Sequence, residues 1–86
     1  MTMTPEFFQQ IGEALYGAEW RLPLSRALGV NYKTIRRWRT GDQLVPAGVA
    51  VELRRLLVYE LESRKQLLAE VEAALAAAGE KEVSDG

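Results

Sequence analysis

The stretch LSRALGVNYKTIRRW, residues 24–38, decides the fold of this 86-residue chain. Gly29 follows an apolar helical pattern over 20–28, and glycine is well suited to the left-handed backbone conformation that ends a helix. Two residues later, Asn31 is a favourable N-cap for another helix over 32–40. The spacing therefore predicts two short helices joined by a tight turn.

The second of these helices has two unlike faces. At roughly 100° per residue, Ile35 and Trp38 fall on one side and predict a core-facing stripe. The opposite side, within an arc of about 140°, carries Tyr32, Lys33, Arg36, Arg37 and Thr40. A helix face rich in cations is usually only solvated, and Tyr32 is equally compatible with packing at the edge of the core. The charges alone therefore do not establish a binding surface.

The same stretch resembles the helix-turn-helix of bacterial and phage transcriptional regulators of the lambda-repressor/Cro type. In that family a small residue precedes the turn glycine by four positions, an apolar residue follows it, and a β-branched residue and then an aromatic or aliphatic one occur further on. The residues in those positions here are Ser25, Gly29, Val30, Ile35 and Trp38. The chain departs from the family at Ser25, where alanine is commoner, and at Pro23, which shortens or bends the first helix. The resemblance covers roughly a quarter of the chain.

The resemblance implies that the helix over 32–40 enters the major groove of double-stranded DNA. Arginine is the commonest base reader because its planar fork matches the O6 and N7 acceptors of guanine, and Arg36 lies near the middle of the cationic arc. The expected base contacts are Tyr32, Lys33, Arg36, Arg37 and Thr40. The expected phosphate contacts, which position the protein without reading sequence, are Arg21, Arg26, Asn31 and Arg39.

Two further helices complete the predicted all-α fold. Thr4 and Pro5 form a start signal for a helix over 5–16, and Pro46 opens a long helix over 46–78. The expected architecture is a compact helix-turn-helix bundle of three short helices plus a long C-terminal helix used for dimerisation. The expected core residues are Phe7, Phe8, Ile11, Ala14, Leu15, Trp20, Leu24, Ala27, Leu28, Ile35, Trp38, Val49, Leu53, Leu56 and Leu57.

The predicted organisation is a helix-turn-helix DNA-binding domain over 1–56, a dimerisation segment over 57–78 and a flexible tail over 79–86. The stripe expected to mediate dimerisation is interrupted by Arg64 and comprises Leu57, Leu61, Leu68, Val71 and Leu75. This stripe either folds back over the first three helices or pairs with a second copy, in parallel or antiparallel orientation. A symmetric dimer would hold two recognition helices about 34 Å apart over a palindromic site.

The composition narrows the function classes. Neither Cys nor His is present, which excludes disulfides, thiolate nucleophiles, imidazole chemistry and Cys/His metal sites. We therefore expect no enzyme activity, cofactor, metal or small-molecule ligand.

The net charge of −1 conceals six basic and no acidic residues over 20–41, against five basic and eight acidic residues over 49–86. No basic-then-apolar leader opens the chain and no apolar run is long enough for a membrane span, so we expect a cytoplasmic protein.

These features together predict a dimeric, sequence-specific DNA-binding transcriptional regulator, expected to be a repressor or autoregulator of the phage or prophage kind. The alternative is an assembly or protein-interaction module, such as a small phage packaging subunit, in which a helix-turn-helix head is carried on an oligomerising helix. A winged-helix architectural protein fits less well, because residues 42–46 lead straight into a helix without a β-hairpin pattern.

Overall fold

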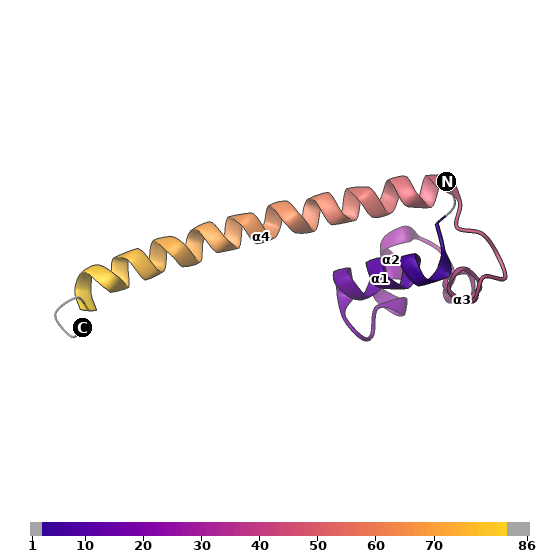
Figure 1. The fold of residues 1–86 in the computed structure, drawn as a ribbon, viewed down its shortest axis with the longest axis horizontal. Coiled ribbons are helices and arrows are strands. Elements are labelled where there is room, and N and C mark those ends of the chain that lie inside the picture. Colours follow the sequence, from indigo (N-terminus) through magenta and orange to yellow (C-terminus); the bar gives the residue numbers. More distant parts are fainter. Residues whose placement is uncertain (1–2, 83–86) are drawn as a thin grey trace.

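The computed structural model describes residues 3–82, with side chains as far as Gly79. The described chain contains four helices: α1 (Pro5–Tyr16), α2 (Arg21–Leu28), α3 (Tyr32–Thr40) and α4 (Ala47–Glu82). No strand occurs within this range, so the all-α prediction is confirmed. Figure 1 shows α1, α2 and α3 gathered beneath the first part of α4, which then extends alone, and the molecule measures 61 × 21 × 21 Å. We call residues 3–56 the head and residues 57–82 the stem.

Local signals set the limits of α1 where the sequence predicts them. The Thr4 hydroxyl accepts a hydrogen bond from the backbone N–H of Phe7 at 3.1 Å, which caps the first turn. Pro5 occupies the first helical position, where its missing N–H has no intrahelical partner to lose. The helix ends before Gly17, which has a φ of 80° and donates its N–H to the carbonyl of Glu13 at 2.8 Å.

The core of the head is built around three aromatic rings. Phe8 makes edge-to-face contacts with Trp20 and with Trp38, at ring-centroid distances of 5.6 and 5.7 Å. Such pairs contribute about 0.5–1.5 kcal/mol beyond the area they bury. Leu24 and Ile35 are completely buried against the rings. The sequence therefore placed both tryptophans and Ile35 correctly in the core.

Four residues expected in the core are exposed instead, which corrects the sequence interpretation. They are Phe7, Ala14, Ala27 and Leu57. Each lies at the margin of an apolar stripe, about 100° or less from a residue that is buried, and a short helix covers only the middle of such a stripe. Val45 is buried although it belongs to the loop before α4, and no periodicity in the sequence marks it.

A close contact between α1 and α2 depends on Gly12. A Cβ atom added at Gly12 would lie 2.2 Å from Cε3 of Trp20, which is closer than any real carbon contact. The indole ring therefore packs directly on the backbone of α1, and only glycine leaves room for it there. No pattern in the sequence indicates this role of Gly12, because it depends on how Trp20 packs against α1 in the folded head.

Helix α4 begins one residue later than predicted. Pro46 precedes the first turn, and its carbonyl accepts hydrogen bonds from the N–H groups of Val49 and Ala50 at 3.0 and 3.3 Å. Leu53 is 1% exposed and is the residue of α4 that enters the core fully. Val49 and Leu56 pack against the same cluster while staying partly exposed.

The long helix does not end at residue 78 as the sequence predicts, and residues 79–82 of the expected tail are helical. Helix α4 continues through Gly79 to Glu82, and Gly79 lacks the positive φ of the glycines that end α1, α2 and α3. A glycine inside a helix costs only about 1 kcal/mol relative to alanine, and the Glu and Lys residues that follow are good helix formers. Residues 83–86 of the predicted tail lie outside the described residues.

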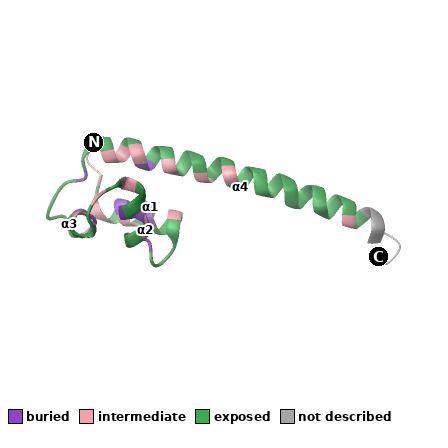
Figure 2. Cartoon of the chain, turned by 180° about the vertical axis from the view of Figure 1, so that it is seen from behind, coloured by how far each residue is buried: buried purple, intermediate pink, exposed green. Residues whose placement is uncertain are grey.

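The stem does not fold back over the head. Figure 2 shows buried residues concentrated in the head, whereas nearly all of the stem is exposed. The five residues expected to mediate dimerisation all belong to this exposed part, from Leu57, which is 38% exposed, to Leu75. The fold-back alternative is therefore not the arrangement of this chain, and the apolar stripe has no cover within the described residues.

Candidate nucleic-acid interface

The turn between α2 and α3 is fixed by backbone geometry. Gly29 has φ 69° and ψ 30°, the left-handed conformation that a side chain would strain. Its N–H donates to the carbonyl of Arg26 at 3.2 Å, and the N–H of Val30 donates to the carbonyl of Ser25 at 3.0 Å. Ser25 is itself buried, and its hydroxyl donates to the carbonyl of Leu22 at 2.8 Å. These bonds set the direction in which α3 leaves the turn.

Asn31 begins α3 as the sequence predicts. Its side-chain oxygen Oδ1 accepts a hydrogen bond from the backbone N–H of Lys33 at 2.8 Å. This bond satisfies one of the free donors in the first turn of the helix. The rest of the exposed carboxamide is available to a ligand, so capping is compatible with the phosphate contact expected of Asn31.

Helix α3 has one buried face and one exposed cationic face, as the sequence predicts. Ile35 and Trp38 are buried and hold the helix on the head. The five expected base contacts are all exposed and lie together on the outer side: Tyr32, Lys33, Arg36, Arg37 and Thr40. Thr40 is partly engaged, because its hydroxyl donates to the carbonyl of Arg37 at 3.3 Å. Tyr32 is 46% exposed, which agrees with its place at the edge of this face.

The cations of this region make no ion pairs with the side chains that the structure describes. The ion pairs within the described side chains all lie on α4 and join Arg55 to Glu52, Arg64 to Glu60, and Lys65 to Glu62. The six cations from Arg21 to Arg39 have no carboxylate within 4.0 Å among the described side chains. A block of positive charge therefore faces outward, where it can attract an anionic ligand.

Arg21 and Arg39 differ from the other cations because their side chains are partly buried. The Arg21 guanidinium lies over the Trp20 ring, 5.6 Å from its centroid, a cation–π contact. The Nε atoms of both arginines are buried without a hydrogen-bond partner among the described residues. Because the aliphatic parts of these two side chains are packed, their terminal nitrogens can reach only a limited volume. Such a restricted position suits a contact to a fixed backbone group such as a phosphate.

A hollow of about 390 Å³ connects the start of α2 with the start of α3. Its lining includes Arg21 and Tyr32, so the structure brings an expected phosphate contact beside an expected base contact. Arg26 lies at the other end of α2, next to the turn. Glu19 also lines the hollow, although no motif in the sequence marks this residue. An anion bound in the hollow would be repelled by this carboxylate, which disfavours the hollow itself as a phosphate site.

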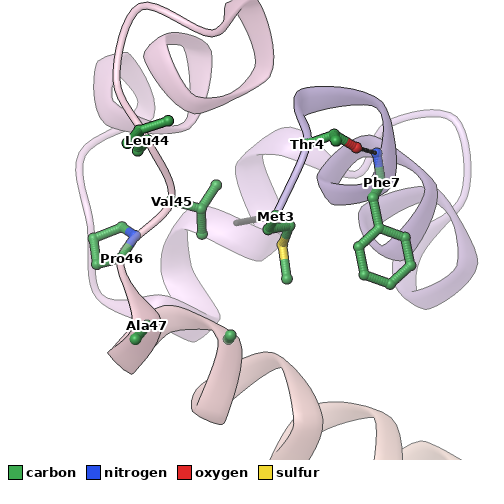
Figure 3. A pocket seen from close by; sticks show the side chains of 8 residues that line it. Met3, Thr4, Phe7, Leu44, Val45, Pro46 and Ala47 are labelled. Atoms are coloured by element: carbon green, nitrogen blue, oxygen red, sulfur yellow. Dashed lines mark hydrogen bonds between the residues drawn. The ribbon is translucent and has the colours of Figure 1, made fainter. Parts of the chain in front are cut away.

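A separate apolar groove of about 630 Å³ lies between the start of α1 and the start of α4 (Figure 3). Its lining is mostly hydrophobic and includes Met3, Phe7, Leu44 and Val45. A second groove of about 310 Å³ continues from Phe7 along α4 to Leu61. Neither groove contains a residue of the cationic face, so the apolar and cationic surfaces of the head are distinct.

Comparisons with protein-family models, with curated proteins and with solved structures give no match to this chain. The functional interpretation therefore depends on the residues and their geometry. Within residues 3–82, no helix combines the length and the apolar character that crossing a lipid bilayer requires.

Proposed function

We propose that this protein is a sequence-specific DNA-binding transcriptional regulator, acting as a homodimeric repressor or autoregulator on a palindromic operator. The observation that carries this proposal is the outer face of α3. Its cations are exposed, lie on a helix held rigidly by Ile35 and Trp38, and have no carboxylate partners among the described residues. A helix of this kind fits the major groove of B-DNA.

In this proposal the side chains divide by role. Arg36 reads a guanine through two parallel hydrogen bonds to O6 and N7, and Lys33 and Arg37 contact neighbouring base edges. Tyr32 and Thr40 lie at the margins of the contact. Arg21, Arg26, Asn31 and Arg39 contact phosphates on either side and fix the helix in the groove. The acidic stem extends away from the head, where the DNA does not repel it.

The proposal is tested by selecting bound sequences from a random double-stranded DNA pool at a stated salt concentration. We expect a palindromic motif. Arg36→Ala should weaken binding to that motif by about 1–3 kcal/mol while leaving non-specific binding nearly unchanged, because a base contact is lost and the phosphate contacts remain.

Arg55→Ala is the matched control, because it removes an exposed arginine from α4 and leaves α3 intact. Equal losses on specific and random DNA for Arg36→Ala would make this residue a phosphate contact. Equal losses for Arg36→Ala and Arg55→Ala would reject α3 as the DNA-reading surface.

An assembly module is the second candidate function, and the exposed stem favours it. A helix that leaves the head and exposes its apolar residues is suited to oligomerisation of any order. Sedimentation distinguishes the two candidates. A dimer that binds one DNA motif supports the regulator, whereas a ring of many subunits without DNA preference supports the assembly module.

A further inference from the structure

The apolar stripe that enters the core of the head at Leu53 continues along the stem, with Arg64 as its one charged position. Leu53 is covered by the core of the head, and the positions that follow it at spacings of four or three residues are exposed or, at Ala78, partly exposed. At roughly 100° per residue they lie on the same side of α4 as Leu53. These positions, which we call the seam, are Leu57, Leu61, Arg64, Leu68, Val71, Leu75 and Ala78. The seam is the surface through which a second α4 can pack.

Arg64 determines which orientation of two stems is favourable. It is the charged member of the seam, and its Nε donates to Oε1 of Glu60 at 3.1 Å. In a parallel pair in register, each seam residue meets its own copy, so two Arg64 side chains would face each other in an apolar layer. Antiparallel stems place Arg64 against a different residue, and its guanidinium stays beside Glu60. The like-charge contact therefore disfavours the parallel pair.

The head limits how far two antiparallel stems can overlap. Leu53 is buried in the core of the head, whereas Leu57 is exposed. A partner helix can therefore pack against α4 only from Leu57 onward. The described helix ends at Glu82. Pairing the described stems over their whole length, residues 57–82, sets Leu57 level with residue 82 of the partner. Sliding the stems together by one heptad would bring Gly79 of the partner to Leu53, where α1 already lies.

This overlap also gives complementary contacts beside the seam. Its two central layers pair Leu68 with Val71 of the partner. The next layers outward pair Arg64 with Leu75 of the partner and then Leu61 with Ala78 of the partner. On one flank, Lys65 faces Glu72 of the partner, and this pairing occurs twice by symmetry. On the other flank, Leu67 faces Ala74 of the partner. Glu72 has no cation within 4.0 Å among the described side chains of its own chain, so it is available for this contact.

We infer that two copies of this chain pair through antiparallel stems, with Leu68 against Val71 of the partner and a head at each end of the seam. The inference rests on the homodimer of the proposed function and specifies its interface. The end of each stem then lies beside the groove of about 310 Å³ that contains Phe7, Leu57 and Leu61 of the other copy.

Cysteine cross-linking tests the orientation directly, because the chain contains no cysteine of its own. In the antiparallel pair, residue 61 of one copy lies level with residue 78 of the other, and the two copies of residue 61 are about 25 Å apart. A disulfide requires Cα atoms within about 7 Å. We therefore expect covalent dimers from an equimolar mixture of Leu61→Cys and Ala78→Cys, and little from either variant alone.

Both substituted positions are exposed or partly exposed, so the head should fold normally. Glu62→Cys, on the opposite side of α4 from the seam, gives the background from random collisions. Efficient cross-linking of Leu61→Cys alone would establish parallel stems and overturn the inference. A mixture that cross-links no faster than the Glu62→Cys background would overturn the proposed alignment, in which residue 61 lies level with residue 78 of the partner.

A charge exchange provides a second test that does not depend on cysteine. Glu72→Lys should raise the dissociation constant of the dimer by roughly threefold to tenfold at low salt, because it places two lysines together at both symmetric sites. The double variant Lys65→Glu, Glu72→Lys should recover most of the affinity. In a parallel pair Glu72 lies beside Leu67, so no loss and no recovery would overturn the antiparallel arrangement.

Sedimentation of the wild-type chain separates this inference from the DNA-binding proposal. A monomer at micromolar concentration overturns the antiparallel dimer. If that monomer still selects a DNA motif and loses it in Arg36→Ala, DNA reading by α3 stands. A dimer with the expected cross-links but no DNA preference supports the interface and rejects the regulator.

Discussion

The head and the stem of this protein derive their order from different sources. The head buries three aromatic rings and several aliphatic side chains, and its helices are capped by Thr4, Asn31 and left-handed glycines. The stem has side-chain pairs along one helix and exposes its seam. Exposed pairs of this kind contribute only about 0.2–1 kcal/mol each. The head is therefore held by its own packing, whereas the described part of the stem has no comparable packing within the chain.

The largest expected effect comes from removing a core ring of the head. Trp38→Ala should lower the free energy of unfolding by about 3–5 kcal/mol, because Trp38 is buried and packs edge-on against Phe8. Urea denaturation followed by circular dichroism measures the change. Leu75→Ala in the stem is the matched control and should change head stability by less than about 0.5 kcal/mol. Similar losses in both variants would show that head and stem unfold as one unit.

Removing the stem tests its role in the proposed regulator. A chain ending at Glu60 should be monomeric, because most of the seam is lost. Its affinity for a palindromic site should fall on the order of 100-fold, since the second half-site no longer benefits from the high effective concentration that a dimer provides. Sedimentation and a DNA titration measure both effects. A truncated chain that remains dimeric would assign the interface to the head, where the apolar groove beside Phe7 is the surface to examine.

The smallest expected changes in stability come from replacing two glycines that lie inside helices. Gly12→Ala should destabilise the head by about 1–3 kcal/mol, because the new methyl group would collide with the Trp20 ring. Gly79→Ala meets nothing within 4 Å and should stabilise the stem by up to about 1 kcal/mol through helix propensity. Thermal unfolding and stem helicity by circular dichroism measure the two changes. A stabilising Gly12→Ala would mean that Trp20 can move away from α1.

The candidate site was largely accessible from the sequence because its signals are local. The sequence identified Gly29 as the turn, Asn31 as the cap and the split between Ile35 with Trp38 and the cationic face of α3. Each of these depends on hydrogen bonds or angles within about one helical turn. The partial burial of Arg21 and Arg39 and the presence of Glu19 in the neighbouring hollow were not predicted, since they depend on contacts between helices.

The sequence by itself determined the four helices, most of their limits and the identity of the central core residues, because spacing and capping act between neighbours in the chain. Only the tertiary structure decided that Trp20 packs on the bare backbone at Gly12, that Val45 is buried, and that Phe7 and Leu57 are not. It also decided that α4 leaves the head and exposes its seam. The physical reason is that an amphipathic stripe specifies which side of a helix seeks cover, whereas the crossing of the helices decides how much of that side is covered.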